Sequence, residues 1–109
     1  MKEYNVKVTP YAKEQMMEIR DYIAYQILNP DAARNQIIKI RAEIRKLSQF
    51  PDRIRTIDEQ PWGSQGVRKI VVNNFYVYFW IDEDNAEVHV TAVAYSKRDQ
   101  ERVLEKVKK

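Results

Sequence analysis

Hydrophobic positions recur with two different periods along the chain, and each period predicts a different element. Residues 4–9 alternate apolar and polar side chains, which is the pattern of a short half-buried strand. Thr9 is expected to cap a helix, and Pro10 suits the first helical position because its missing N–H costs nothing there. The apolar positions that follow recur every three or four residues and predict a helix over residues 10–27; they are Ala12, Met16, Ile19, Tyr22, Ile23 and Ile27.

A second helix is predicted to begin near Pro30 or Asp31 and to end before Phe50-Pro51-Asp52. Its apolar stripe consists of Ala33, Ile37, Ile40, Ile44 and Leu47. Its polar face is basic and carries Arg34, Lys39, Arg41, Arg45 and Lys46. Because the link between the two helices is short, they should form an antiparallel hairpin.

The second half of the chain has the pattern of three strands. Residues 67–72, 75–81 and 87–95 are rich in β-branched and aromatic side chains, whereas residues 53–66 contain Pro61, Gly63 and Gly66 and should form a loop. Asn73-Asn74 suits a tight turn, and residues 82–85 form a second, acidic turn. A third helix is expected over residues 98–107. The order β-α-α-β-β-β-α predicts an α+β fold, a helical hairpin packed on a small antiparallel sheet, as one domain over residues 1–109.

Alternation within the strands predicts which side chains share a face of the sheet. In the last strand Val88, Val90, Ala92 and Ala94 should face the core, which would place Tyr95 on the open face. The middle strand is apolar on both sides, with Tyr76, Tyr78 and Trp80 on the side away from Phe75, Val77, Phe79 and Ile81. These three aromatics could stack on nucleic-acid bases, but we favour a role in the core or in a protein interface.

Composition narrows the possible chemistry. The chain has no Cys and one His, which excludes disulfides, thiolate chemistry and nearly every nitrogen or sulfur metal site, so we expect no metal and no cofactor. His89 is interpreted as a surface or partly buried residue, and the acidic residues Asp82, Glu83, Asp84 and Glu87 as a solvated turn. No apolar run spans a bilayer and residues 1–10 lack the apolar middle of a signal peptide, so we expect a cytoplasmic protein without membrane contact.

Basic residues gather at the ends of two strands. Arg68 and Lys69 open the first strand of the three, and Lys97 and Arg98 follow the last. These two sites are expected to approach each other at the sheet edge. Such a cluster could hold a phosphate or stabilise phosphoryl charge, and ordinary surface charge explains it equally well.

The whole pattern resembles the RelE/ParE superfamily of bacterial type II toxin-antitoxin toxins. The segments that carry the resemblance are VTPYAKEQMMEIRDYI, NPDAARNQIIKIRAEIRKLSQFPD and GVRKIVVNNFYVYFWIDEDNAEVHVTAVAYSKRDQ. The resemblance implies a helical hairpin on an antiparallel sheet, growth inhibition, plasmid stabilisation and neutralisation by a cognate antitoxin. It also allows a homodimer or a hetero-oligomer with the antitoxin.

Two activities are known in this superfamily, and the resemblance places the functional residues at Arg68, Tyr95, Lys97 and Arg98. RelE-like members cleave messenger RNA on the ribosome and are enzymes, whereas ParE-like members poison DNA gyrase without being enzymes. Phe75 stands where the nucleases carry a basic residue, and no Tyr follows Arg98. Tyr95 occupies the place of a His that many ParE-like members have before the Arg-Asp pair, here Arg98-Asp99. The resemblance therefore favours gyrase poisoning; ribosome-dependent RNA cleavage and a non-toxic or decayed module are the alternatives.

Overall fold

The computed structural model describes residues 2–26, 28–95 and 104. In chain order the elements are β1 (Asn5–Val8), α1 (Pro10–Asp21), the π-helical segment η1 (Tyr22–Gln26), α2 (Pro30–Arg45), β2 (Arg68–Val72), β3 (Phe75–Asp82) and β4 (Glu87–Tyr95). Short 3₁₀ turns, η2 (Lys46–Ser48) and η3 (Pro51–Arg53), follow α2. No helix in this part of the chain is both long and apolar enough to cross a membrane.

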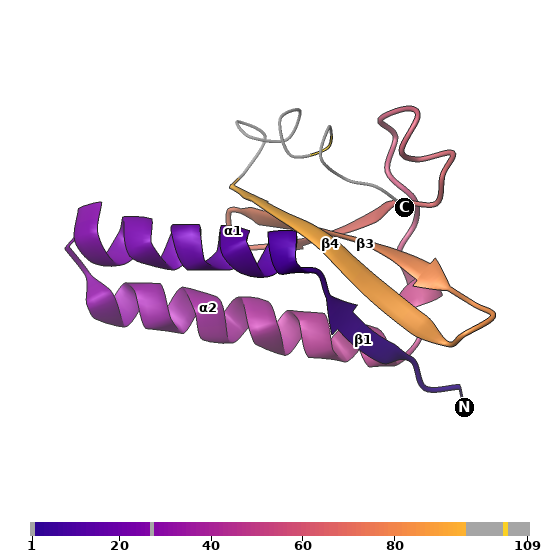
Figure 1. Cartoon of the computed structure of the whole chain (residues 1–109), viewed down its shortest axis with the longest axis horizontal. Coiled ribbons are helices and arrows are strands. Elements are labelled where there is room, and N and C mark those ends of the chain that lie inside the picture. The colour runs from indigo at the N-terminus through magenta and orange to yellow at the C-terminus, as the bar shows by residue number, and fades with distance from the viewer. Residues whose placement is uncertain (1, 27, 96–103, 105–109) are drawn as a thin grey trace.

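The four strands form one mixed sheet in the order β1-β4-β3-β2. The predicted antiparallel meander of β2, β3 and β4 is confirmed, and β1 adds to it by pairing with β4 in parallel. The α+β class and the helical hairpin on the sheet are also confirmed (Figure 1). The sheet is mixed because α1 and α2 carry the chain from β1 back to the start of the meander.

The two helices begin where the sequence predicts. The Thr9 hydroxyl accepts a hydrogen bond from the Ala12 N–H at 3.2 Å, and the Asn29 side chain accepts one from the Ala32 N–H at 3.1 Å. Each cap satisfies a backbone N–H that has no partner within the first helical turn. The predicted stripe of α2 and its following turn is buried throughout.

The first helix departs from the prediction at its carboxyl end. Regular α-helix stops at Asp21, and η1 has the wider π-helical turn. Ile19 and Ile23 still pack against the core, but Tyr22 is 55% exposed, so its predicted place on the buried face is wrong. Tyr22 lies at the margin of the stripe formed by Ile19 and Ile23, and its side chain faces solvent.

A β-bulge overturns the predicted alternation of the last strand. Tyr78 pairs with Ala92, and the next residue of β3, Phe79, pairs with Val90, so Thr91 is the extra residue of β4. The extra residue reverses the faces beyond it. Val88, Val90 and Val93 therefore pack in the helix-side core, whereas Ala92 and Ala94 pack on the opposite face.

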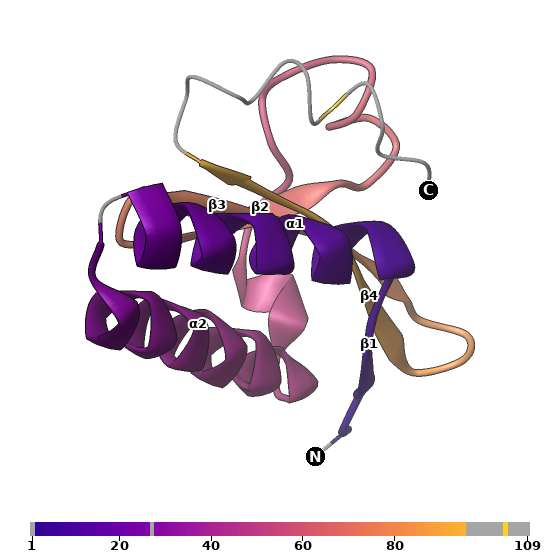
Figure 2. The ribbon, with the colours of Figure 1, turned by 60° about the vertical axis from the view of Figure 1, so that its left-hand side comes forward.

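The second face of the sheet has its own cover. Ile57 and Val67, from the segment between α2 and β2, pack with Tyr78, Ala92, Ala94 and Leu104. Figure 2 shows this segment on the side of the sheet away from the helices. The predicted helix over residues 98–107 lies outside the described residues except for Leu104, which is buried.

Candidate functional site

Arg68 is the first residue of β2 and is anchored to the chain that precedes the strand. Its Nη1 donates hydrogen bonds to the carbonyl oxygens of Ile54 and, at 3.5 Å, of Asp52. The side chain lies on the helix-side face, because Arg68 pairs directly with Phe79. Its positive charge contributes to holding the pKa of Glu83 below its usual range, after the hydrogen bonds that Glu83 accepts from Tyr4 and Lys2. The guanidinium is thus held at the end of the sheet that carries the β3–β4 turn.

Tyr95 lies at the other end of the sheet. It pairs with Phe75, four residues along β3 from the partner of Arg68, which is a separation of about 13 Å at the usual rise per strand residue. Its ring meets the Phe75 ring edge to face with centroids 5.3 Å apart. Phe75 belongs to the helix-side core, so the prediction that Tyr95 lies on the open face is wrong, again because of the bulge.

The predicted meeting of the two basic strand ends rests on a wrong geometric premise. In a three-stranded meander the first and third strands run in the same direction, so the start of β2 and the end of β4 lie at opposite ends of the sheet. Lys97 and Arg98 lie outside the described residues. Of the four residues assigned to the site, the structure therefore locates Arg68 and Tyr95, and it holds these two apart.

Two of the three aromatic side chains of the second face, Tyr76 and Tyr78, belong to its core, as we favoured from the sequence. Tyr78 is fully buried, and burial raises the pKa of its hydroxyl. Tyr76 is partly buried, and the Lys69 ammonium lies 4.3 Å from its ring centroid. Tyr78 cannot stack on a base in this arrangement, so the three aromatics do not form an open base-binding face together.

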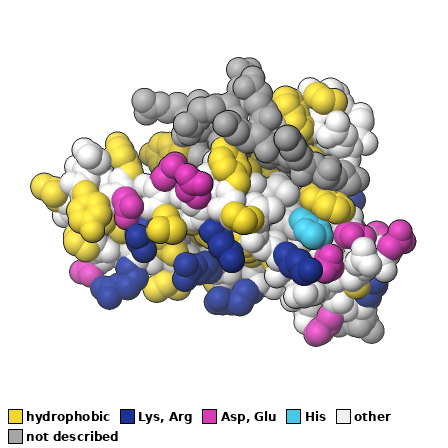
Figure 3. Space-filling model, in the orientation of Figure 1, with side chains coloured by type: hydrophobic (Ala, Val, Ile, Leu, Met, Phe, Trp, Pro, Cys, Tyr) yellow, Lys and Arg dark blue, Asp and Glu magenta, His cyan; other side chains and the backbone are white. Residues whose placement is uncertain are grey.

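A groove with basic edges lies between α1, α2 and β1. It encloses about 420 Å³. Its apolar lining comes from β1 and from facing positions of both helices: Val6, Val8, Met16, Met17, Ile37 and Ile44. Its charged lining is entirely cationic and consists of Lys13, Arg20, Arg41 and Arg45. Figure 3 shows Lys and Arg side chains in a row along the helical hairpin, with hydrophobic side chains between them.

The cations of the groove differ in how they are neutralised. Arg20 pairs with Asp21 at 3.2 Å, and away from the groove Arg34 pairs with Asp31 at 2.6 Å. Lys13, Arg41 and Arg45 have no carboxylate partner among residues 2–26 and 28–95. Unpaired cations around an apolar floor suit an amphipathic segment that carries carboxylates. The basic face of the second helix predicted this charge, but the groove itself depends on how the three elements pack.

A third group of side chains was not predicted. Asp82, Glu87 and His89 lie together at the end of the β3–β4 hairpin, and one ligand atom from each lies within 4.8 Å of the others. From the sequence we interpret the acidic residues as a solvated turn and His89 as a surface or partly buried residue. The missing signal is the strand register, which sets Asp82 directly opposite Glu87. A carboxylate and imidazole set of this kind could hold a metal ion.

Comparison with known proteins identifies the family. The family model described as "ParE toxin of type II toxin-antitoxin system, parDE" matches residues 6–100. No curated protein matches the chain in sequence.

Solved chains from toxin-antitoxin systems share the fold at low sequence identity. A chain of the chromosomal ParDE system from P. aeruginosa is 17% identical, with a TM-score of 0.73 over 89% of this chain and 100% of that one. A chain of the RelBE2 toxin-antitoxin complex from Mycobacterium tuberculosis is 16% identical, with a TM-score of 0.59 over 87% and 93%. A mutant of E. coli toxin RelE in the free state is 11% identical, with a TM-score of 0.63 over 97% and 99%. With the family match over residues 6–100, the chain belongs to the ParE toxin family of type II toxin-antitoxin systems, within the RelE/ParE superfamily.

Proposed function

We propose that this protein is a toxin that arrests bacterial growth by poisoning DNA gyrase and that a cognate antitoxin neutralises it. The observation that carries the proposal is the match of the ParE toxin family model to residues 6–100. Gyrase acts in the bacterial cytoplasm, where we therefore place the toxin. Arg68, Tyr95, Lys97 and Arg98 remain the residues that we assign to action on the target.

The geometry around Arg68 supports gyrase over messenger RNA as the target. Cleavage at an RNA 2′-hydroxyl needs a base for its proton and donors for the phosphoryl charge. A guanidinium stays protonated and cannot serve as that base. The Tyr95 hydroxyl belongs to the opposite end of the sheet, so it is not placed beside Arg68. Within the described part of the chain, Arg68 can therefore make an electrostatic contact with a target, but Tyr95 does not lie beside it.

The two targets can be separated with purified components. Wild-type toxin should inhibit supercoiling by gyrase and trap cleaved gyrase-DNA complexes, while primer extension should show intact messages on ribosomes. Cuts in the ribosomal A-site codon with unaffected gyrase would instead establish RNA cleavage. In that case Arg68→Ala should lower the cleavage rate by about 100- to 1000-fold, as loss of one preorganised donor does. Normal growth on expression of folded, soluble toxin would reject the toxin assignment.

We assign the basic groove to the antitoxin. A segment with apolar side chains on one face would bury Met17, which is 54% exposed, together with the other apolar groove residues. Carboxylates along its edges would pair with Lys13, Arg41 and Arg45. Opposite charges across an interface steer association and select the partner, so this groove favours an acidic antitoxin segment over a neutral one.

Charge reversal tests this assignment. The double variant Arg41→Glu, Arg45→Glu should weaken binding of the co-expressed antitoxin by about 10-fold or more. Arg34→Glu is the matched control, because Arg34 lies on the same helix, outside the groove, and already pairs with Asp31. Titration calorimetry compares the three proteins. Equal affinity of the double variant and the control would place the antitoxin elsewhere.

A further inference from the structure

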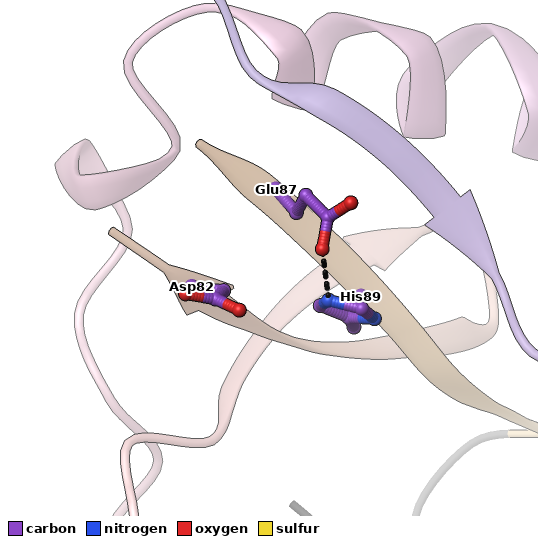
Figure 4. A group of neighbouring side chains, drawn as sticks. All are labelled: Asp82, Glu87 and His89. Atoms are coloured by element: carbon purple, nitrogen blue, oxygen red, sulfur yellow. Dashed lines mark hydrogen bonds and ion pairs between the residues drawn. The ribbon is translucent and has the colours of Figure 1, made fainter. Parts of the chain in front are cut away.

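Strand pairing brings three metal-ligating side chains to one end of the sheet. Asp82 of β3 lies directly opposite Glu87 of β4, and His89 follows Glu87 by two residues. Side chains two residues apart on a strand share a face, so all three project from the side of the sheet opposite the helices. Figure 4 shows the three side chains together at this end of the hairpin. Each is half-buried, and one ligand atom from each lies within 4.8 Å of the other two.

The imidazole of His89 is held in position by its neighbours. Its ring stacks on Trp80, the residue opposite it on β3, with centroids 4.5 Å apart and an angle of 10° between the planes. Its Nε2 lies 3.2 Å from Glu87 Oε1, as the dashed line in Figure 4 marks. The nitrogen available for an ion therefore already faces a carboxylate oxygen.

Both carboxylates are oriented by further contacts. Glu87 uses its other oxygen, Oε2, for the Lys7 ammonium at 2.6 Å, and this hydrogen bond holds the pKa of Glu87 below its usual range. Asp82 Oδ2 accepts a hydrogen bond from the Asn85 side-chain amide at 2.9 Å, which lowers the pKa of Asp82 in the same way. Such outer contacts fix ligand orientation in metal sites. These contacts leave Glu87 Oε1 directed at His89.

We propose that Asp82, Glu87 and His89 bind a divalent transition-metal ion of the Zn²⁺ type. One imidazole nitrogen with two carboxylate oxygens suits Zn²⁺ better than Mg²⁺ or Ca²⁺, which take oxygen ligands alone. Two ligand atoms at Zn²⁺ bond lengths of about 2.0–2.2 Å lie at most about 4.4 Å apart, so the side chains need to close by only a few tenths of an ångström. Water would complete the coordination shell.

A bound ion would link β3 to β4 at the end where the acidic turn joins them. It would also neutralise Asp82 as well as Glu87, whereas Lys7 pairs with Glu87. An ion that binds only the folded chain raises its stability by mass action. The site lies on the face of the sheet opposite the antitoxin groove.

The composition of the chain makes the test direct. His89 is the only His and there is no Cys, so any imidazole that responds to Zn²⁺ is His89. Tag-free protein is titrated with zinc chloride while the imidazole nitrogen resonances are followed by NMR and the stoichiometry by calorimetry. We expect one ion per chain, a shift of the His89 Nε2 resonance and a higher melting temperature. Magnesium chloride should reproduce none of these effects.

Variants distinguish this site from other carboxylates. His89→Gln should abolish binding, and Asp82→Asn and Glu87→Gln should each weaken it by about 10-fold or more. Glu43→Gln is the control, because Glu43 also pairs with a Lys but lies on α2. An unchanged His89 resonance at millimolar Zn²⁺, or undiminished binding in Asp82→Asn, would overturn the proposal. Asp82→Asn decides the matter even where the His89 variant fails to fold.

Discussion

The two faces of the sheet are covered by different kinds of structure. The helix-side face packs against α1 and α2, whose apolar stripes repeat regularly and bury Phe75, Val77 and Phe79. The opposite face is covered by an irregular segment, through Ile57 and Val67, and by Leu104. Regular elements cover a sheet with many similar contacts, whereas an irregular cover depends on a few close fits. The two faces should therefore respond differently to substitution.

The largest effect is expected at the centre of the helix-side face. Phe79 is fully buried, so Phe79→Ala removes apolar contacts and leaves a cavity, which should lower the free energy of unfolding by about 3–5 kcal/mol. Val71→Ala on neighbouring β2 is the control, because Val71 is 61% exposed and should change stability by about 0.5 kcal/mol or less. Urea unfolding of both variants measures the difference. If Phe79→Ala lowered the free energy of unfolding by less than Val71→Ala, this face of the sheet would be loosely packed.

The irregular cover depends on a close approach at Gly63. A Cβ atom added there would lie 2.1 Å from the carbonyl oxygen of Ile57, which is rigid backbone. Gly63→Ala must force the backbone at Gly63 and Ile57 apart within the segment, and we expect it to lower the free energy of unfolding by about 1–3 kcal/mol.

Hydrogen exchange locates that effect. Faster exchange of the Ile57 N–H, which bonds to the Val67 carbonyl, should accompany the loss, while the helix amides of α2 stay protected. If all amides of Gly63→Ala exchanged at wild-type rates, the segment would accommodate the added methyl group without loss of stability.

Gln15 of α1 bonds to the backbone of β4. It is buried, and its Oε1 accepts a hydrogen bond from the Val93 N–H at 2.7 Å, just beyond the bulge. Gln15→Leu leaves that N–H without its partner and should lower the free energy of unfolding by about 1–3 kcal/mol. Glu14→Leu, at the exposed neighbouring position, is the control and should not lower it. Calorimetric melting compares the two. Identical melting temperatures would show that the Val93 N–H finds another acceptor.

Tyr78 offers a change that removes no hydrogen bond. Its hydroxyl is buried without a partner among the described residues, so keeping it in the core is a cost. Tyr78→Phe should leave the free energy of unfolding within about 0.5 kcal/mol of the wild type or raise it. Guanidinium unfolding measures this. A clear loss of stability would mean that the hydroxyl has an acceptor outside the described residues.

The features of this fold that can be predicted from the sequence are local ones. Side-chain period and turn residues are local properties, so the first two helices, the strands, the Thr9 cap and the positive φ of Asn73 follow from them. Thr91 carries no sign that it is the extra residue of a bulge, because a bulge is fixed by pairing with β3. The faces of the sheet predicted for Ala92, Ala94 and Tyr95 are therefore wrong.

The candidate sites depend even more on contacts between distant residues. The basic face of α2 is visible in the sequence, but the groove needs β1 and α1 beside it. Asp82, Glu87 and His89 come together through strand register, which a period-2 pattern alone does not specify. Arg68 was correctly placed at the start of a strand, yet its supposed proximity to the end of β4 ignored the direction of the strands.

The smallest effect is expected at the exposed polar contacts beside the β3–β4 turn. Glu83 accepts hydrogen bonds from the Tyr4 hydroxyl at 2.8 Å and from Lys2 at 3.2 Å, and these hold its pKa below the ordinary value of 4.5. Because the pKa of Glu83 is lower in the folded state than in the unfolded state, its ionised carboxylate stabilises the fold at a pH above the unfolded-state pKa. This stabilisation is lost as the pH falls through the folded-state pKa. Stability should therefore decline more steeply below about pH 4.5 in the wild type than in Glu83→Gln. The free energy of unfolding of both proteins is measured from pH 3 to pH 7 in steps of about one pH unit. Parallel pH profiles would show that Tyr4 and Lys2 do not stabilise the ionised carboxylate in solution.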